Sequence, residues 1–161
     1  MIGLLNRLFT RAAPVLSEAS ARDAAVISSL HALSFRRGWS EHEIEALLID
    51  RNVVTHRATS GRTLAGFILS RLIDEEAEIL SVAVAPAWRG RSLARNLLNL
   101  HLRRLAGLGV TAVFLEVGES NTPATKLYER AGFHEVGRRE NYYQETAAKG
   151  STAVVLRRDL A

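Results

Sequence analysis

Three arginines crowd around a single glycine in the stretch PAWRGRSLARNLL, residues 86–98, just before a leucine-rich run that is typical of a helix. The first backbone N–H groups of a helix have no partner within the helix and lie at the positive end of its dipole, so they attract anions. Arg89 and Arg91 add formal positive charge at the same place. A diphosphate fits such a site better than a single carboxylate does, because loop amides and guanidinium groups can both bond to it.

An isolated basic turn is more often an ordinary solvated loop, and two phosphate-binding motifs are excluded here. The stretch is not a Walker loop, because it lacks the GKS ending, and it is not a dinucleotide fingerprint, because it lacks GxGxxG. An arginine-rich RNA-binding surface is a third alternative. It ranks last, because no aromatic stacking platform accompanies its five arginines and they cannot all share one helical face. These are Arg89, Arg91, Arg95, Arg103 and Arg104.

The elements on either side of this loop are predicted from hydrophobic patterning. The near-continuous apolar run EILSVAVAP, residues 78–86, predicts a central strand that is covered on both faces. Leucines recur at helical spacing after the loop and predict a helix over residues 92–109 that ends in glycines. The next strand is TAVFLEV, residues 111–117, and a short helix over 122–132 follows, with Thr122 as its cap and Pro123 at the first helical position.

Two further helices are predicted before the central strand. The first runs from a cap at Ser20 to about Phe35. In the second, GWSEHEIEALLID, Ser40 and Glu43 form a capping box, and Trp39 and Ile44 take the hydrophobic-staple positions. The remaining predicted strands are residues 15–20, 52–58, 63–73, 133–139 and 152–160. The interleaved order predicts an α/β (α+β) fold, in which a mixed sheet of about seven strands carries about four helices on its two faces.

Length and composition limit the possible functions. A chain of 161 residues suits one domain, which we place at 14–161, with residues 1–13 as an N-terminal extension in preference to a membrane anchor or export signal. The absence of cysteine excludes disulfides, zinc–thiolate sites and cysteine nucleophiles, and it fits a reducing cytoplasm. The five histidines show no metal-ligand spacing, so no metal site is expected. The net charge of +4 comes almost entirely from arginine, which favours planar phosphate or carboxylate partners.

The arginine loop resembles the phosphate loop of the GNAT family of acetyl-CoA-dependent N-acetyltransferases, which runs Gln or Arg, two residues, Gly, one residue, then Gly or Ala. In this sequence the six positions are Arg89, Gly90, Arg91, Ser92, Leu93 and Ala94. Ser92 stands where the family usually has glycine, and a serine brings a Cβ and a hydroxyl to a place where backbone approaches phosphate. The resemblance runs from about residue 15 to the C-terminus and is strongest over residues 77–98 and 114–133.

Within this family the sequence is most similar to the RimI type, which acetylates the N-terminal residue of a small-subunit ribosomal protein. The order LEV, SN, LYE and GF, followed by RRENYY, is that of the RimI type. The resemblance implies a GNAT fold with a splayed pair of central strands. It also implies that the pantetheine arm of acetyl-CoA bonds to the backbone of Val82, Ala83 and Val84. Asn121, Ala124 and Tyr128 are implied as further cofactor contacts.

The same resemblance implies that Glu116 and Tyr128 carry the proton transfers, since acetyl transfer needs a neutral amine and a donor to the departing thiolate. Glu116 lies in the apolar stretch FLEV, so burial is expected to raise its pKa from about 4.3 toward that of a useful base. The alternative for Glu116 is a carboxylate paired with a nearby arginine, and Glu78 is a second candidate base. For Tyr128 the alternative is a packed core tyrosine. A phenol with a pKa of about 10 can reprotonate a thiolate of about 8.5.

The leading hypothesis is direct acetyl transfer from acetyl-CoA to the N-terminal amine of a peptide or protein in the cytoplasm, with a ribosomal protein as the expected acceptor. No direct contact with nucleic acid or membrane is expected, and the chain is expected to be a monomer or a weak homodimer. One alternative is acetylation of a small-molecule amine or a lysine side chain. Another is a non-catalytic acyl-CoA-binding domain, for which Ser92 is the motivating departure from the family pattern.

Overall fold

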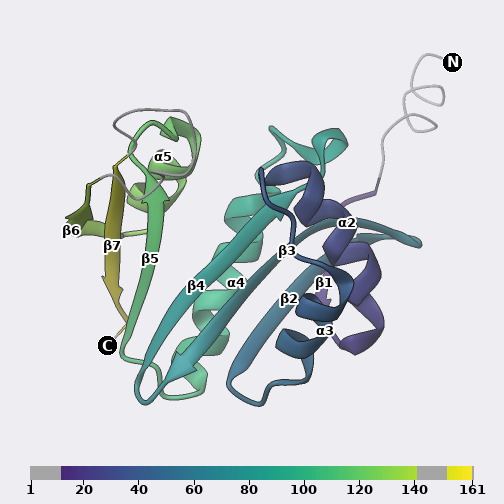
Figure 1. The fold of residues 1–161 in the computed structure, drawn as a ribbon, viewed down its shortest axis with the longest axis horizontal. Coiled ribbons are helices and arrows are strands. Elements are labelled where there is room, and N and C mark those ends of the chain that lie inside the picture. Colours follow the sequence, from purple (N-terminus) through teal and green to yellow (C-terminus); the bar gives the residue numbers. More distant parts are fainter. Residues whose placement is uncertain (1–11, 141–151, 161) are drawn as a thin grey trace, which may run out of the picture.

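The structure, a computed structural model, describes residues 12–140 and 152–160. Within them, seven strands form one sheet with four α-helices on its faces, in the order that the sequence predicts (Figure 1). The strands are β1 (Val15–Glu18), β2 (Val53–Ser60), β3 (Thr63–Ile73), β4 (Glu76–Val84), β5 (Ala112–Gly118), β6 (His134–Arg139) and β7 (Ala153–Asp159). The helices are α2 (Ala24–Ser34), α3 (Glu41–Ile49), α4 (Leu93–Gly107) and α5 (Thr122–Arg130), with short 3-10 turns η1 (Ala21–Asp23) and η2 (Pro86–Trp88).

The sheet is mixed, and its two central strands separate. The strand order is β1-β2-β3-β4-β5-β7-β6, in which only β4 and β5 run parallel. Their pairing covers only residues 76–78 of β4 against 112–114 of β5. Beyond that point the two strands diverge, as Figure 1 shows. The predicted splay is therefore confirmed, and it leaves one edge of β4 without a strand partner over the last part of its length.

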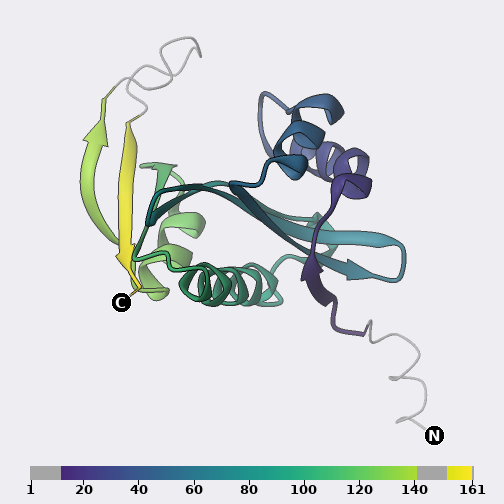
Figure 2. The same cartoon turned by 90° about the horizontal axis from the view of Figure 1, so that it is seen from below.

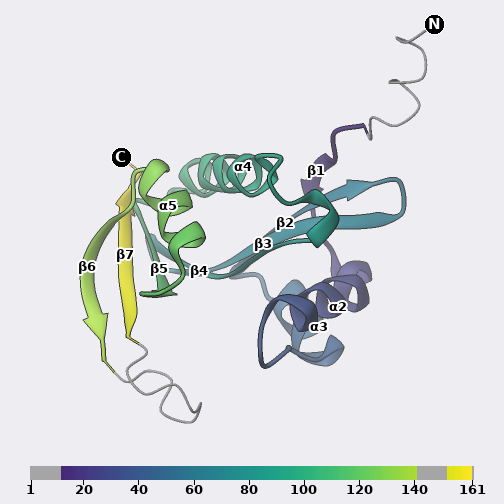
Figure 3. The same ribbon diagram turned by 90° about the horizontal axis from the view of Figure 1, so that it is seen from above.

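Two apolar cores lie on opposite faces of the sheet. Helices α4 and α5 cover one face and helices α2 and α3 cover the other, as Figures 2 and 3 show from below and from above. Leu97 and Leu98 of α4 are fully buried in the first core, and Ile27 of α2 and Ile44 of α3 are fully buried in the second. The described residues include no helix that combines the length and the apolar composition needed to cross a bilayer.

Local sequence signals place the helix ends to within about two residues, except that α2 begins only after the 3-10 turn η1, which follows the predicted cap at Ser20. At α3, Glu43 N donates to Ser40 Oγ over 3.1 Å and Ser40 N donates to Glu43 Oε2 over 2.9 Å, which confirms the capping box. At α5 the prediction is off by one residue, because Asn121 and not Thr122 is the N-cap and Pro123 is therefore the second helical residue. Asn121 is the N-cap because its Oδ1 accepts a hydrogen bond from Ala124 N over 3.3 Å.

A buried polar chain joins the sheet to α4. The Nδ1 atoms of His56 and His101 are 2.8 Å apart, and Nε2 of His101 lies 2.6 Å from Oγ of Ser70. All three side chains are buried. Burial lowers the pKa of His101 to about 3, with a smaller contribution from the charge of His56, and burial also lowers the pKa of His56.

We therefore expect the free energy of unfolding to fall as the pH drops below about 6.5. Below that pH the unfolded chain binds more protons on His56 and His101 than the folded chain does, because both pKa values are lowered by folding, so acid favours the unfolded state. Each such histidine contributes at most about 1.4 kcal/mol per pH unit. Urea denaturation at pH 7.5, 6.5 and 5.5 measures the effect. A His42→Gln variant, altered at an exposed position on α3, serves as the control and keeps the slope. Stability that is constant or rises toward pH 5.5 would show that the buried pair does not matter.

Candidate functional site

A cleft of about 870 Å³ opens between α4 and α5 at the end of β4. It brings together residues from four segments that are distant in sequence: the end of α2, the last part of β4, the loop into α4, and α5. Every residue expected to bind the cofactor lines this cleft, with the exception of Arg91. These residues are Val82, Ala83, Val84, Arg89, Gly90, Ser92, Leu93, Ala94, Asn121, Ala124 and Tyr128.

The last part of β4 presents backbone groups without a strand partner to the gap between the strands. Ala85 N donates to Ala65 O of β3 over 2.8 Å. Because backbone polar groups alternate sides along a strand, those of Val82 and Val84 point away from β3, toward the side where β5 has diverged. Arg89 Nε donates to Val84 O over 3.2 Å, which shows that this carbonyl is open to a partner. A ligand with amide groups can therefore bond along this edge as an added strand would.

The loop before α4 explains why glycine suits its fourth position. Ser92, the N-cap of α4, has φ 61° and ψ 16°, in the left-handed region that favours glycine. Its hydroxyl makes no capping hydrogen bond. The first bond of α4 is donated by Asn96 N to Ser92 O, so the N–H groups of Leu93 and Ala94 have no partner within the helix. These donors and the adjacent Arg89 fit a diphosphate.

Replacing Ser92 by glycine should therefore stabilise the protein by about 0.5–1 kcal/mol, since it relieves left-handed strain at the cost of some chain entropy. Acetyl-CoA affinity should stay equal or improve. Thermal unfolding and calorimetric titration measure the two quantities. Gly90→Ala is the opposite control, because Gly90 has φ 72° with open space where the added methyl group would lie, so alanine adds strain without a clash and should destabilise. A tenfold loss of affinity in Ser92→Gly would instead identify the serine hydroxyl as a ligand.

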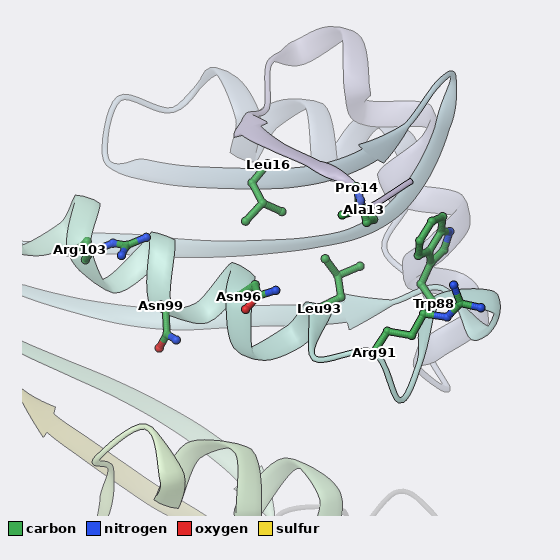
Figure 4. A pocket seen from close by; sticks show the side chains of 9 residues that line it. All are labelled: Ala13, Pro14, Leu16, Trp88, Arg91, Leu93, Asn96, Asn99 and Arg103. Atoms are coloured by element: carbon green, nitrogen blue, oxygen red, sulfur yellow. The ribbon is translucent and has the colours of Figure 1, made fainter. Parts of the chain in front are cut away.

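Arg91 does not line the cleft, contrary to expectation. Its guanidinium carbon lies 5.3 Å from the centre of the Trp88 ring, in a cation–π contact. Both side chains line a separately lined, adjoining cleft of about 530 Å³, next to Pro14 and Leu16 (Figure 4), and Trp88 lines the large cleft as well. The two arginines flank Gly90, which has φ 72°, and they lie on opposite sides of this turn, so that of the two only Arg89 faces the large cleft, which we call the cofactor cleft after the function proposed below.

Tyr128 lies in the wall of the cleft and is only 7% exposed. Its ring packs edge-on against Phe133, with ring centres 5.6 Å apart. Burial raises the pKa of Tyr128 to about 12. The phenol is therefore protonated at neutral pH, as a hydrogen-bond donor must be, but it is a weaker acid than the sequence suggested.

Glu116 is not buried, and this expectation was wrong. It lies on β5 with 28% of its side-chain surface exposed, and Arg139 Nη1 donates to its two carboxylate oxygens over 3.0 and 3.2 Å. The alternative, pairing with an arginine, is what the structure shows. The reason is alternation along β5, because Leu115 and Val117 turn into the core under α4 and α5 whereas Glu116 turns to the opposite face. It does not belong to the lining of the large cleft.

The cleft also contains residues that the sequence analysis did not select. Ser34 and Phe35, at the end of α2, close one side of it. Lys126 and Arg130 of α5 lie on the other side and add positive charge. Their spacing of four residues places both on one face of a helix, so the sequence could have predicted a basic surface there. No local pattern indicates that Phe35 reaches this site, because its position depends on how α2 packs on the sheet.

Comparison with known proteins gives consistent results. Residues 24–133 match the family described as "Acetyltransferase (GNAT) family". The ribosomal protein bS18-alanine N-acetyltransferase of Haemophilus influenzae is 31% identical over 143 residues, which cover 82% of this chain and 97% of that protein. N-alpha-acetyltransferase RimI of Mycobacterium tuberculosis is 40% identical over 106 residues, 63% of each chain. The crystal structure of the ribosomal-protein-S18-alanine N-acetyltransferase from Escherichia coli has a TM-score of 0.84 and 26% identity, covering 92% of this chain and 94% of that one.

Proposed function

The chain belongs to the GNAT family of acetyltransferases, and from this premise we propose that it acetylates the N-terminal α-amine of a protein, as RimI-type enzymes do. Membership makes it an N-acetyltransferase of a family that uses acetyl-CoA. The proposal that the acceptor is a protein N-terminus is supported by the similarity to the Haemophilus influenzae enzyme, which extends over almost the whole of that protein. A ribosomal protein is the corresponding acceptor, and the cytoplasm the corresponding compartment. In this proposal residues 14–161 form one catalytic domain.

The cleft has the parts that acetyl-CoA requires. The free N–H groups at the start of α4 and the Arg89 side chain would hold the diphosphate. The unpaired backbone edge at Val82 and Val84 would hold the amides of the pantetheine arm. Lys126 adds positive charge for the remaining phosphate. When bound, acetyl-CoA supplies the acyl group as a thioester.

The acceptor amine must lose a proton before or during attack, and the departing thiolate needs a donor. We assign the first role to Glu116, acting through water, and the second to the Tyr128 hydroxyl. An α-amine has a pKa of about 7.7–8.0 and is partly neutral at cellular pH, whereas a lysine amine, at about 10.4, is almost entirely protonated. An N-terminal amine therefore needs less help from a base than a lysine does, and the Glu116 carboxylate, which is partly exposed and paired with Arg139, would act through water.

A comparison of acceptors tests this proposal. With acetyl-CoA present, CoA release is measured for peptides with a free N-terminus, for N-blocked peptides containing lysine, and for small polyamines. We expect the free N-terminal peptides to be acetylated with the highest kcat/KM, at the α-amine as located by mass spectrometry. Activity confined to small amines would contradict the protein acceptor and leave the family and the fold intact. Acetyl-CoA binding without turnover of any amine would favour a non-catalytic acyl-CoA-binding domain.

A further inference from the structure

A groove of about 800 Å³, distinct from the two clefts beside α4, lies between α3 and β4, on the face of the sheet that α2 and α3 cover. Trp39, Leu47, Leu80 and Ser81 are among the residues that line it. Phe35 lines both this groove and the cofactor cleft, so the two meet at the end of α2. A molecule in the groove can therefore approach, from the α2 and α3 side, the end of the cofactor that emerges between the separated strands.

Ser81 in this groove has a hydroxyl without a partner. The residue is 6% exposed, and its Oγ has no hydrogen-bond partner within the described part of the chain. Its orientation follows from an irregularity in β4, where Ser81 pairs with Leu69 and Ile79 pairs with Ser70, so that Leu80 is an extra residue. A buried hydroxyl without a partner is unfavourable, and native proteins keep few of them. Because Ser81 lines the groove, a ligand bound there can complete the hydrogen bonding of this hydroxyl.

The position of Ser81 identifies which ligand this is. Ala83 lies two residues further along β4, on the same face, and lines the cofactor cleft. Two residues along a strand span about 7 Å, so Ser81 lies about that far from the part of β4 that lines the large cleft. In the proposed function the large cleft holds the cofactor, which leaves the groove beside Ser81 for the acceptor.

We propose that Ser81 binds the acceptor amine: its Oγ accepts a hydrogen bond from one N–H of the neutral amine and holds the nitrogen lone pair toward the gap between β4 and β5. Ser81 gives up and takes up no proton in this role, which remains with Glu116. The inference rests on the proposed function insofar as the acceptor is an N-terminal amine. According to this inference, Ser81 on the α2 and α3 side of β4 contacts the substrate.

Thr55 provides a matched control. Its Oγ1 is also buried without a partner, and the residue is likewise 6% exposed. Thr55 lies on β2, however, and β3 separates that strand from β4. Removing either hydroxyl should have the same small effect on folding, while only that of Ser81 should affect the acceptor.

The experiment compares Ser81→Ala, Thr55→Val and the wild-type chain with the amine acceptor that the wild-type chain acetylates best. For Ser81→Ala we expect kcat/KM for the acceptor to fall about tenfold, the effect of one lost hydrogen bond in a buried site. The KM for acetyl-CoA should stay within twofold, and the melting temperature should be unchanged or higher. Thr55→Val should match the wild type in both kinetic constants. A second variant, Ser81→Thr, keeps the hydroxyl and should retain most of the activity.

Three results would overturn the inference. The first is an acceptor kcat/KM within twofold of wild type in Ser81→Ala. The second is an equal loss in Thr55→Val. The third is a loss that appears in the KM for acetyl-CoA instead of the acceptor. Because the acceptor is chosen by wild-type activity, failure of the N-terminal peptides alone contradicts the proposed function and leaves the test of Ser81 valid.

Discussion

Glu116→Gln is expected to lower kcat/KM for an N-terminal peptide by about 10²–10⁴-fold, the usual effect of removing a general base. Glutamine keeps the shape of the side chain and loses the ability to take a proton. Because Glu116 does not line the cofactor cleft, the Kd for acetyl-CoA should not change. Stability should change little as well, since exposed ion pairs such as Glu116 with Arg139 contribute at most about 1 kcal/mol.

Steady-state kinetics at saturating acetyl-CoA measure this effect, and Glu78→Gln is the matched control. Glu78 is the second candidate base and lies on β4 at the point where the pairing with β5 ends. Its replacement should leave kcat/KM within about threefold of the wild type. If Glu78→Gln loses more activity than Glu116→Gln, the two assignments must be exchanged. If neither variant loses activity, proton removal depends on solvent alone.

Tyr128→Phe is expected to lower kcat by about 10²-fold, the lower end of the range for acid catalysis. In the proposed function the Tyr128 phenol, which lines the cleft, would donate a hydrogen bond to the leaving thiolate. With a pKa of about 12, complete transfer to a thiolate of about 8.5 is uphill, so donation of a hydrogen bond is the main contribution. Because the folded pKa is raised, the phenol stays protonated up to about pH 10, and no loss of kcat on its account is expected below that pH.

Phenylalanine keeps the edge-on contact with Phe133 and removes only the hydroxyl. The melting temperature and the Kd for acetyl-CoA of Tyr128→Phe should therefore stay close to those of the wild type, and these two measurements control for damage to the cleft. Single-turnover kinetics with peptide and acetyl-CoA isolate the chemical step. Wild-type rates in that experiment would show that Tyr128 is a core residue that packs beside the cofactor and takes no part in the reaction.

Much of the fold was predictable because its signals are local. The capping box at Ser40 and Glu43, the leucine spacing of α4 and the apolar run of β4 each depend on neighbours in sequence. The loop before α4 was predictable for the same reason, since a strand, a tight turn and a helix start follow one another directly. The splay of β4 and β5 came from the family resemblance, because no local pattern says where two parallel strands stop pairing.

The errors concern the directions of side chains, which depend on tertiary packing. FLEV looks apolar, but α4 and α5 cover only one face of β5, so Glu116 on the other face stays exposed. Arg91 sits one residue from a glycine in a left-handed conformation and packs on Trp88. Neither the direction of the Arg91 side chain nor the partner of Glu116 can be deduced from residue types alone.

Contacts between residues that are distant in sequence could not be predicted, for the same reason. His56 and His101 are 45 residues apart in sequence and meet only because α4 packs on the sheet. The unpartnered hydroxyl of Ser81 results from an irregular register between β3 and β4. Sequence patterns predict that these residues lie on a strand or a helix, but not what each side chain finds there.

A crystal structure of the protein with acetyl-CoA tests the central claim most directly. The account predicts a diphosphate held by the N–H groups that open α4, beside Arg89, with the pantetheine arm along Val82 and Val84 and the thioester in the gap between β4 and β5. A cofactor bound elsewhere, for example in the separate cleft beside Trp88 and Arg91, or a gap closed by pairing of β4 with β5, would contradict it.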